Sequence, residues 1–196
     1  MAVNIQVALP HWSFFLALDE DLERLARYIE FCDDNLECYS LELARTLMTA
    51  AAEVDVVAQQ LCERLEPATA QRDITTYRET ILRHYPQFPQ SKASVLHERI
   101  VLTPWEQWTE ARAPVWWRAH NKVKHERHRH FSQATLKNAL NAVGGLMIIT
   151  LYLYRQAARD GLLSPSPRIF NVGHPIAVDR MAYNQTQLIY MVPDAI

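Results

Sequence analysis

The chain has 196 residues and a formal net charge of −2, with 49% apolar and 21% charged residues. This composition is that of a globular protein, and the length allows one sizeable core but not two ordinary domains. The balanced charge excludes a basic field over the whole protein, so any nucleic-acid site must be local. Four glycines are too few for Gly-rich phosphate loops or for a turn-dense all-β fold.

The N-terminal part of the chain predicts a short strand followed by a helix. Residues 3–7 (VNIQV) alternate apolar and polar side chains, as a short edge strand does. A helix is expected over about 19–31, and the segment 33–40 (DDNLECYS) breaks its pattern. No positively charged segment precedes an apolar run, so we expect no signal peptide. The odd number of cysteines, three, fits a reducing cytoplasm.

The helix expected over 40–65 has the strongest periodic pattern in the chain. Ser40 suits its N-cap, apolar residues recur at helical spacing, and Pro67 ends it. Asp55 falls within the apolar arc of this helix, which leaves two interpretations. It is a carboxylate at the edge of the arc that reaches water, or a buried acid paired with a cation, for which Arg118 is the best partner.

The central part of the chain predicts a third helix and the start of a fourth. The third covers 73–85 (DITTYRETILRHY), and a loop over 86–94 follows it. In the motif TPWEQW, Thr103 suits an N-cap, Pro104 the first helical position and Glu106 the closing position of a capping box. These three signals indicate a helix that begins at this motif.

Two further helices are expected after Pro114. This proline interrupts the preceding pattern and opens a new helical segment, PVWWRAHNKVKHERHRHF. Ser132 is the expected cap of the last long helix, which ends at Asp160 and Gly161. The tail, 162–196, has turn residues and short β-prone runs, which are typical of a covering extension.

These elements predict a mainly α fold: an antiparallel bundle of four to five helices with an irregular, short-strand C-terminal extension. We expect a single domain over 1–196, with its core at about 18–161. The longest apolar run, 142–154, is too short for a membrane span of ~20 residues. It contains Gly144 and Gly145, which are costly inside a helix and indicate a close helix–helix approach, as across a dimer axis. The tryptophans between 105 and 117 suit a core better than a base-stacking surface.

The stretch RAHNKVKH, residues 118–125, concentrates positive and titratable side chains. Arg118 and His125 are seven residues apart and share one helix face, and Asn121, Lys122 and Arg129 fall within about 40° of them. An apolar stripe lies to one side, so we expect the basic face to border the buried side of the helix.

Several kinds of site are compatible with this stretch. A solvated basic face is the commonest explanation of such a run. A metal site is disfavoured, because HERH lacks the spacing of HExxH and the flanking cations repel a metal. A metal-free phosphoryl-transfer site would use His as acid or base and Arg to stabilise charge on phosphorus. A phosphate- or partner-binding surface without chemistry is the remaining alternative.

The stretch also resembles a known family. Arg118 and His125 enclose six residues, and an Arg followed by four to six residues and a His, at the end of a helix in a small bundle, resembles the HEPN-domain motif. The flanking PVWWRAHNKVKHER and the apolar helix SQATLKNALNAVGGLMIITLYL also resemble HEPN-like bacterial proteins. As an architecture, the resemblance covers roughly 40–160.

The resemblance implies a function. Many HEPN members are metal-independent endoribonucleases of toxin–antitoxin and phage-defence systems, in which two protomers form one cleft. In such a site His125 would assist attack by the RNA 2′-hydroxyl and Arg118 would stabilise the transition state. Other members are non-catalytic nucleotide-binding or dimerisation modules. Ala119 stands where active members usually have a polar residue, often Asn, which favours this alternative.

The expectation from the sequence is therefore a cytoplasmic homodimer that acts on RNA without metal, other cofactor or membrane, or a non-catalytic module that binds RNA or a nucleotide. An antitoxin or another defence-system protein is a further candidate partner. The candidate site residues are Arg118 and His125 for catalysis, Asn121, Lys122 and Arg129 for substrate contact, and Asp55 and His120 in support.

Overall fold

The structure, a computed structural model, describes residues 9–67, 73–96, 99–179 and 188–196. Its helices are α1 (Pro10–Leu25), α2 (Leu41–Leu65), α3 (Ile74–His84), α4 (Val115–His130), α5 (Leu136–Leu153) and α6 (Arg155–Arg159). Short 3₁₀ segments are η1 (Asp33–Asn35), η2 (Phe88–Gln90), η3 (Glu106–Glu110) and η4 (Phe131–Gln133). The strands are β1 (Lys92–Val95), β2 (Ile100–Leu102), β3 (Phe170–Gly173), β4 (Ala177–Asp179) and β5 (Ile189–Met191). The fold is thus mainly helical, as predicted, and the strand predicted over 3–7 lies outside the described residues.

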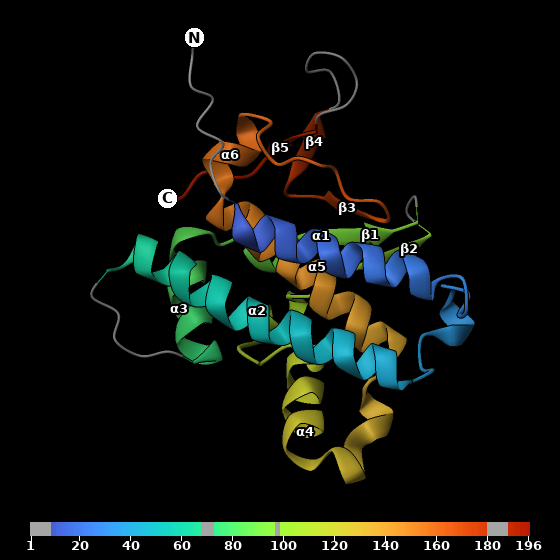
Figure 1. Cartoon of the computed structure of the whole chain (residues 1–196). Helices are drawn as coiled ribbons and strands as arrows, with labels where there is room; N and C mark the ends of the chain where they lie inside the picture. Colours follow the sequence, from blue (N-terminus) through green and yellow to red (C-terminus); the bar gives the residue numbers. More distant parts are fainter. Residues whose placement is uncertain (1–8, 68–72, 97–98, 180–187) are drawn as a thin grey trace.

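Helix α5 forms the centre of the molecule. It is apolar all round and packs most extensively on α2, with α1, α4 and strand β1 also in contact (Figure 1). By length and composition it is long enough to cross a membrane, yet 83% of that stretch is buried inside the fold. It is therefore the core helix of this protein.

The N-terminal helix differs from its prediction at both ends. It begins at Pro10, not near Asp19, and ends at Leu25, not near Phe31. Pro10 occupies the first turn, where its fixed φ favours helix and its missing N–H costs nothing. Trp12 and Leu22 are among the side chains that this helix buries.

Helices α2 and α3 confirm their predictions. Ser40 is the N-cap of α2, and its hydroxyl accepts a hydrogen bond from the Leu43 amide at 3.1 Å. Asp73 caps α3 in the same way, with its carboxylate accepting from the amides of Thr75 and Thr76. Each side chain satisfies N–H groups that the first helical turn leaves unpaired.

Three local predictions are wrong. The motif at 103–108 leads into the 3₁₀ segment η3 and not an α-helix, although the Thr103 hydroxyl donates to Glu106 at 2.7 Å. The expected loop over 86–94 contains η2 and the start of β1. The cap of α5 is Thr135, which accepts from the Asn138 amide, and not Ser132, which lies in η4.

The C-terminal extension contains short strands, as predicted, and joins the core. Strand β3 pairs with β1 in a three-stranded antiparallel sheet of order β2–β1–β3, while β4 and β5 form a separate pair. The buried carboxylate of Asp19 accepts hydrogen bonds from the amides of Arg168, Ile169 and Phe170 at 2.6, 3.2 and 3.1 Å. Helix α1 thereby holds the beginning of the extension against the sheet.

The two glycines of α5 are explained within one chain, without a dimer axis. A Cβ at Gly144 would lie 3.0 Å from the Cβ of Ala93 in strand β1, and one at Gly145 would lie 3.3 Å from the Trp116 ring. The four tryptophans of the 105–117 region are all buried, which confirms their place in the core.

Candidate anion-binding site on helix α4

Helix α4 is anchored at one end and exposed at the other. Pro114 precedes its first turn, and the first half buries Trp116, Trp117, Ala119, His120 and Val123. Every residue from 124 to 129 is exposed. The backbone leaves helical geometry at residue 126, with φ −136° and ψ 47°. Figure 1 shows α4 and the following segment projecting from the body of the molecule.

Four of the five Arg and Lys side chains of α4 differ from most other described cations in having no acidic partner. Arg118, Lys122, Lys124 and Arg127 form no ion pair with any described residue, whereas Arg129 pairs with Glu126 at 3.3 Å. Elsewhere in the described chain the arginines paired with Asp or Glu are Arg24, Arg45, Arg78, Arg83, Arg99, Arg112, Arg155, Arg159 and Arg168. Unbalanced positive charge therefore gathers on α4.

An open groove of about 1020 Å³ separates the N-terminal half of α2 from the C-terminal half of α4. Its apolar lining residues are Leu41, Ala44, Met48, Val123 and Phe131. Its polar and charged lining residues are Arg45, Thr49, Lys124, His125, Arg127 and His128. The groove thus combines apolar surface with a rim of cations and imidazoles.

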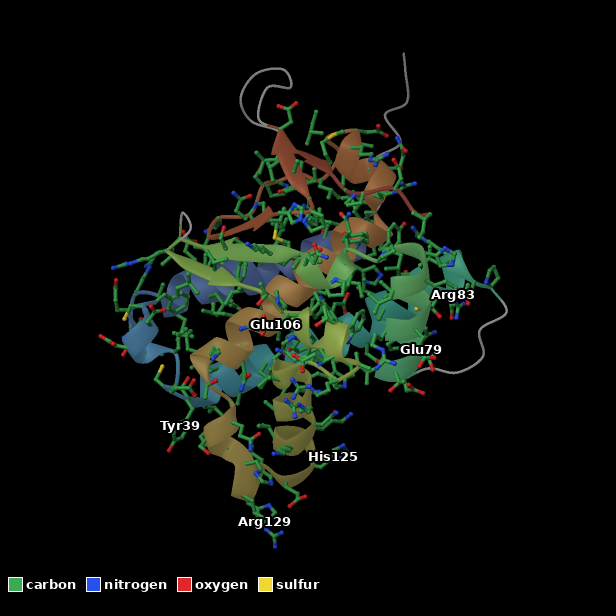
Figure 2. All side chains as sticks on the ribbon, turned by 180° about the vertical axis from the view of Figure 1, so that it is seen from behind. Tyr39, Glu79, Arg83, Glu106, His125 and Arg129 are labelled. Atoms are coloured by element: carbon green, nitrogen blue, oxygen red, sulfur yellow. The ribbon has the colours of Figure 1, made fainter. Side chains whose placement is uncertain are left out.

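One aromatic side chain, Phe131, lines this groove and contacts a second, Tyr39. The rings of Phe131 and Tyr39 meet edge to face, with centroids 5.6 Å apart, and Tyr39 is 53% exposed. Figure 2 shows Tyr39, His125 and Arg129 at the same end of the molecule. An exposed ring beside a basic groove can stack on a planar ligand.

A second, smaller hollow of about 350 Å³ lies on another side of α4, against η4 and the start of α5. Its lining residues are Glu37, Val115, Arg118, Ala119, Lys122, Ser132, Gln133, Thr135 and Asn138. Arg118 therefore lines this hollow, whereas His125 lines the groove. Within one chain the structure does not bring the two predicted catalytic side chains into one cavity.

The predicted basic face is exposed, and part of it borders the two hollows. Arg118, Asn121, Lys122, His125 and Arg129 are all exposed. The buried side of α4 is formed by its apolar residues and His120. Arg118, Lys122 and His125 line hollows beside that buried side, as expected, whereas Asn121 and Arg129 line neither hollow. Local packing of α2 and α5 against α4 creates the two hollows.

The two residues predicted to support the site are Asp55 and His120. Asp55 is exposed and forms no ion pair with Arg118, so the buried-pair interpretation is wrong and the water-facing one holds. His120 is buried against Trp117, and no described residue hydrogen bonds to its Nδ1. Burial, with a smaller contribution from Lys124 and His125, lowers the pKa of His120 to about 4. This imidazole is neutral near pH 7 and adds no charge to the site.

In the parts of the chain that the structure describes, no three His, Cys, Asp or Glu side chains lie close enough together to hold a metal ion. Comparisons with protein-family models, with curated protein sequences and with solved structures found no match. The interpretation of the site therefore rests on its geometry and charge.

Four lining residues of the groove were missed by sequence reasoning: Arg45, Lys124, Arg127 and His128. Three of them belong to the basic run that the sequence marks. On an ideal helix Lys124 and Arg127 lie well away from Arg118, whereas His128 is one turn from His125. Only the position of α2 beside α4 shows that they line a shared groove. Arg45 gave no signal, because it has an ordinary polar position on α2 and pairs with Glu42.

Proposed function

We propose that this protein binds single-stranded RNA in the groove between α2 and α4. The observation that carries the proposal is the concentration of unpaired cations on α4, two of which, Lys124 and Arg127, line a groove with an apolar floor. Cations on a rim neutralise backbone phosphates, and apolar or aromatic surface accepts unstacked bases. The resemblance to HEPN domains favours RNA as the polyanion.

A purely structural role explains these cations poorly. Like charges at adjacent turns of a helix repel one another and destabilise it slightly. Most of the arginines that the structure describes lie beside a carboxylate, but Arg127 does not, and Lys124, like the other described lysines, has no acidic partner. A bound polyanion would supply the missing negative charge.

Fluorescence anisotropy tests this proposal with a labelled single-stranded RNA and a matched hairpin duplex. The double variant Lys124→Gln, Arg127→Gln should weaken single-strand binding, and the slope of log K against log salt should fall by about 1.4, since each lost phosphate contact contributes ~0.7. Lys92→Gln is the matched control, because Lys92 is also exposed and unpaired but lies on strand β1. Equal loss in both variants would contradict a site on α4.

Cleavage of the bound RNA is a second candidate function, and the exposure of His125 favours it. This imidazole lines the groove and has no hydrogen-bond partner in the described chain, so it is available to an RNA 2′-hydroxyl. Arg118 is about 10 Å away along the helix axis, at 1.5 Å per residue, and lines the other hollow. Joint action on one phosphate would therefore combine His125 of one protomer with Arg118 of a second.

Mixing two inactive variants tests this composite site. Wild-type protein in excess EDTA should cut single-stranded RNA and leave cyclic phosphate ends, while Arg118→Ala and His125→Ala should each be inactive. A mixture of the two variants should regain activity, because a mixed dimer contains one intact site. If the wild-type protein binds RNA but does not cut it, the proposed function is binding alone. Activity that mixing does not restore would refute the composite site.

A further inference from the structure

We propose that the smaller hollow between α4 and the start of α5 is a separate binding site for a phosphate-type oxyanion. The proposal does not depend on RNA binding by the larger groove. It rests on three unpaired hydrogen-bond donors that line one cavity of about 350 Å³, together with the electrostatic setting of α5.

The donors come from two elements that face each other. Arg118 and Lys122 lie one turn apart on α4, and Ser132 lies in η4 across the hollow. None of these three side chains has a hydrogen bond or ion pair with a described residue. An Arg guanidinium supplies a planar fork for an oxyanion, a Lys ammonium a point charge, and a Ser hydroxyl a neutral donor.

The beginning of α5 adds positive potential without competing for the ligand. The N-terminus of a helix carries a partial positive charge, and α5 has no acidic residue in its first turn. Its first amides are already used: those of Leu136 and Lys137 donate to the carbonyls of Cys38 and Leu36, and that of Asn138 donates to Thr135. The ligand would therefore be held by side chains, with the helix end contributing only its field.

One carboxylate in the hollow should weaken anion binding, so substitutions can be chosen that either raise or lower the affinity for phosphate. Glu37 also lines the hollow, is exposed, and forms no ion pair with Arg118 or Lys122. Its charge repels an anion. Removal of Glu37 should therefore strengthen binding at the same site at which removal of Lys122 weakens it.

The test is a titration of the ¹⁵N-labelled full chain with inorganic phosphate, compared with chloride at equal ionic strength. Phosphate should shift the signals of Ser132, Gln133 and the Asn138 side-chain amide. Lys122→Gln should weaken phosphate binding about fivefold, and Glu37→Gln should strengthen it about two- to fivefold, as expected for exposed ionic contacts. The control Lys92→Gln, on strand β1 away from both cavities, should leave phosphate affinity unchanged.

Two results would overturn the proposal: chloride producing the same shifts as phosphate, or phosphate affinity that is indifferent to both Lys122→Gln and Glu37→Gln. Competition between inorganic phosphate and labelled RNA then identifies the natural source of the oxyanion. If phosphate displaces labelled RNA, the hollow holds a backbone phosphate of a strand that crosses α4. If RNA stays bound, the hollow takes a free phosphate-type ligand. Loss of RNA binding in Arg127→Gln with phosphate binding intact separates this site from the groove.

Discussion

Replacement of His120 by leucine should make the protein more resistant to acid. His120 is only 6% exposed, and its Nδ1 has no hydrogen-bond partner in the described chain. Burial, followed by repulsion from Lys124 and His125, lowers its pKa to about 4. An imidazole in an unfolded chain titrates near 6.5. The folded protein therefore resists protonation of this side chain.

The sign and size of the effect follow from this difference. Between pH 6.5 and 4 the unfolded chain binds the His120 proton more readily than the folded chain does, so acid favours unfolding. The stability that neutral His120 provides is fully present above pH 6.5 and is lost as pH falls towards about 4. At ~1.4 kcal/mol per pH unit, the whole loss is about 3 kcal/mol.

Urea unfolding between about pH 7 and pH 4.5 measures this loss. Wild-type protein should lose stability faster than His120→Leu, and the gap between the curves should widen as pH falls. The exposed neighbour His128 provides the control, because His128→Leu should follow the wild type. Carboxylates whose pKa is lowered by arginine, such as Glu66 beside Arg83, also weaken in acid but do so equally in all three proteins. Parallel curves for wild type and His120→Leu would refute the reasoning.

Two further substitutions test the packing of the tail and of the core helix. Asp19→Ala should lower the free energy of unfolding by about 3 kcal/mol, because two of the three amides that it leaves unpaired belong to buried residues. The control is Asp21→Ala, an exposed change on the same helix, which should alter the free energy of unfolding by no more than ~0.5 kcal/mol. Urea unfolding measures both values. Gly144→Ala should lower the melting temperature more than Gly145→Ala, since its Cβ would meet the Cβ of Ala93, which the strand backbone fixes, at 3.0 Å.

The sequence predicted best the elements whose signals are local. Helix α2 has an N-cap at Ser40 and a long periodic pattern, and the structure begins and ends it where the pattern does. Pro114 likewise marks the start of α4. In both cases the residues that decide the helix end are next to it in the chain, so no tertiary contact is needed to predict them.

Elements that depend on distant partners were missed. The segment around Trp12 and Phe15 is apolar at nearly every position, so its helical period is weak, and its burial against the rest of the core decides its structure. Strand β1 has only four residues, Lys92–Val95, and pairs with 170–173 on one side. From sequence alone, a run of four residues is predicted as loop, because the strand that pairs with it cannot be identified.

The candidate site also has one property that is local in sequence and one that depends on distant elements. The positive charge of α4 is readable from the sequence, since it depends only on composition. Which cations share a cavity is not readable, because α2 and α5 pack on different sides of α4 and divide its exposed face. An ideal helical wheel places Arg118 and His125 together, whereas the neighbouring elements assign them to different hollows.

The distribution of ion pairs gives the strongest internal reason to assign a ligand-binding role to α4. The same chain pairs Arg24, Arg45 and Arg168 with carboxylates at its surface, so exposed arginines are usually neutralised here. The outer half of α4 buries little apolar surface and leaves Lys124 and Arg127 without such partners. Unbalanced positive charge at a surface repels itself, and an anion that neutralised it would remove that cost. Under the proposed function, Lys124 and Arg127 would lower the stability of the free protein slightly and strengthen its binding of RNA, a trade-off that is common at functional surfaces.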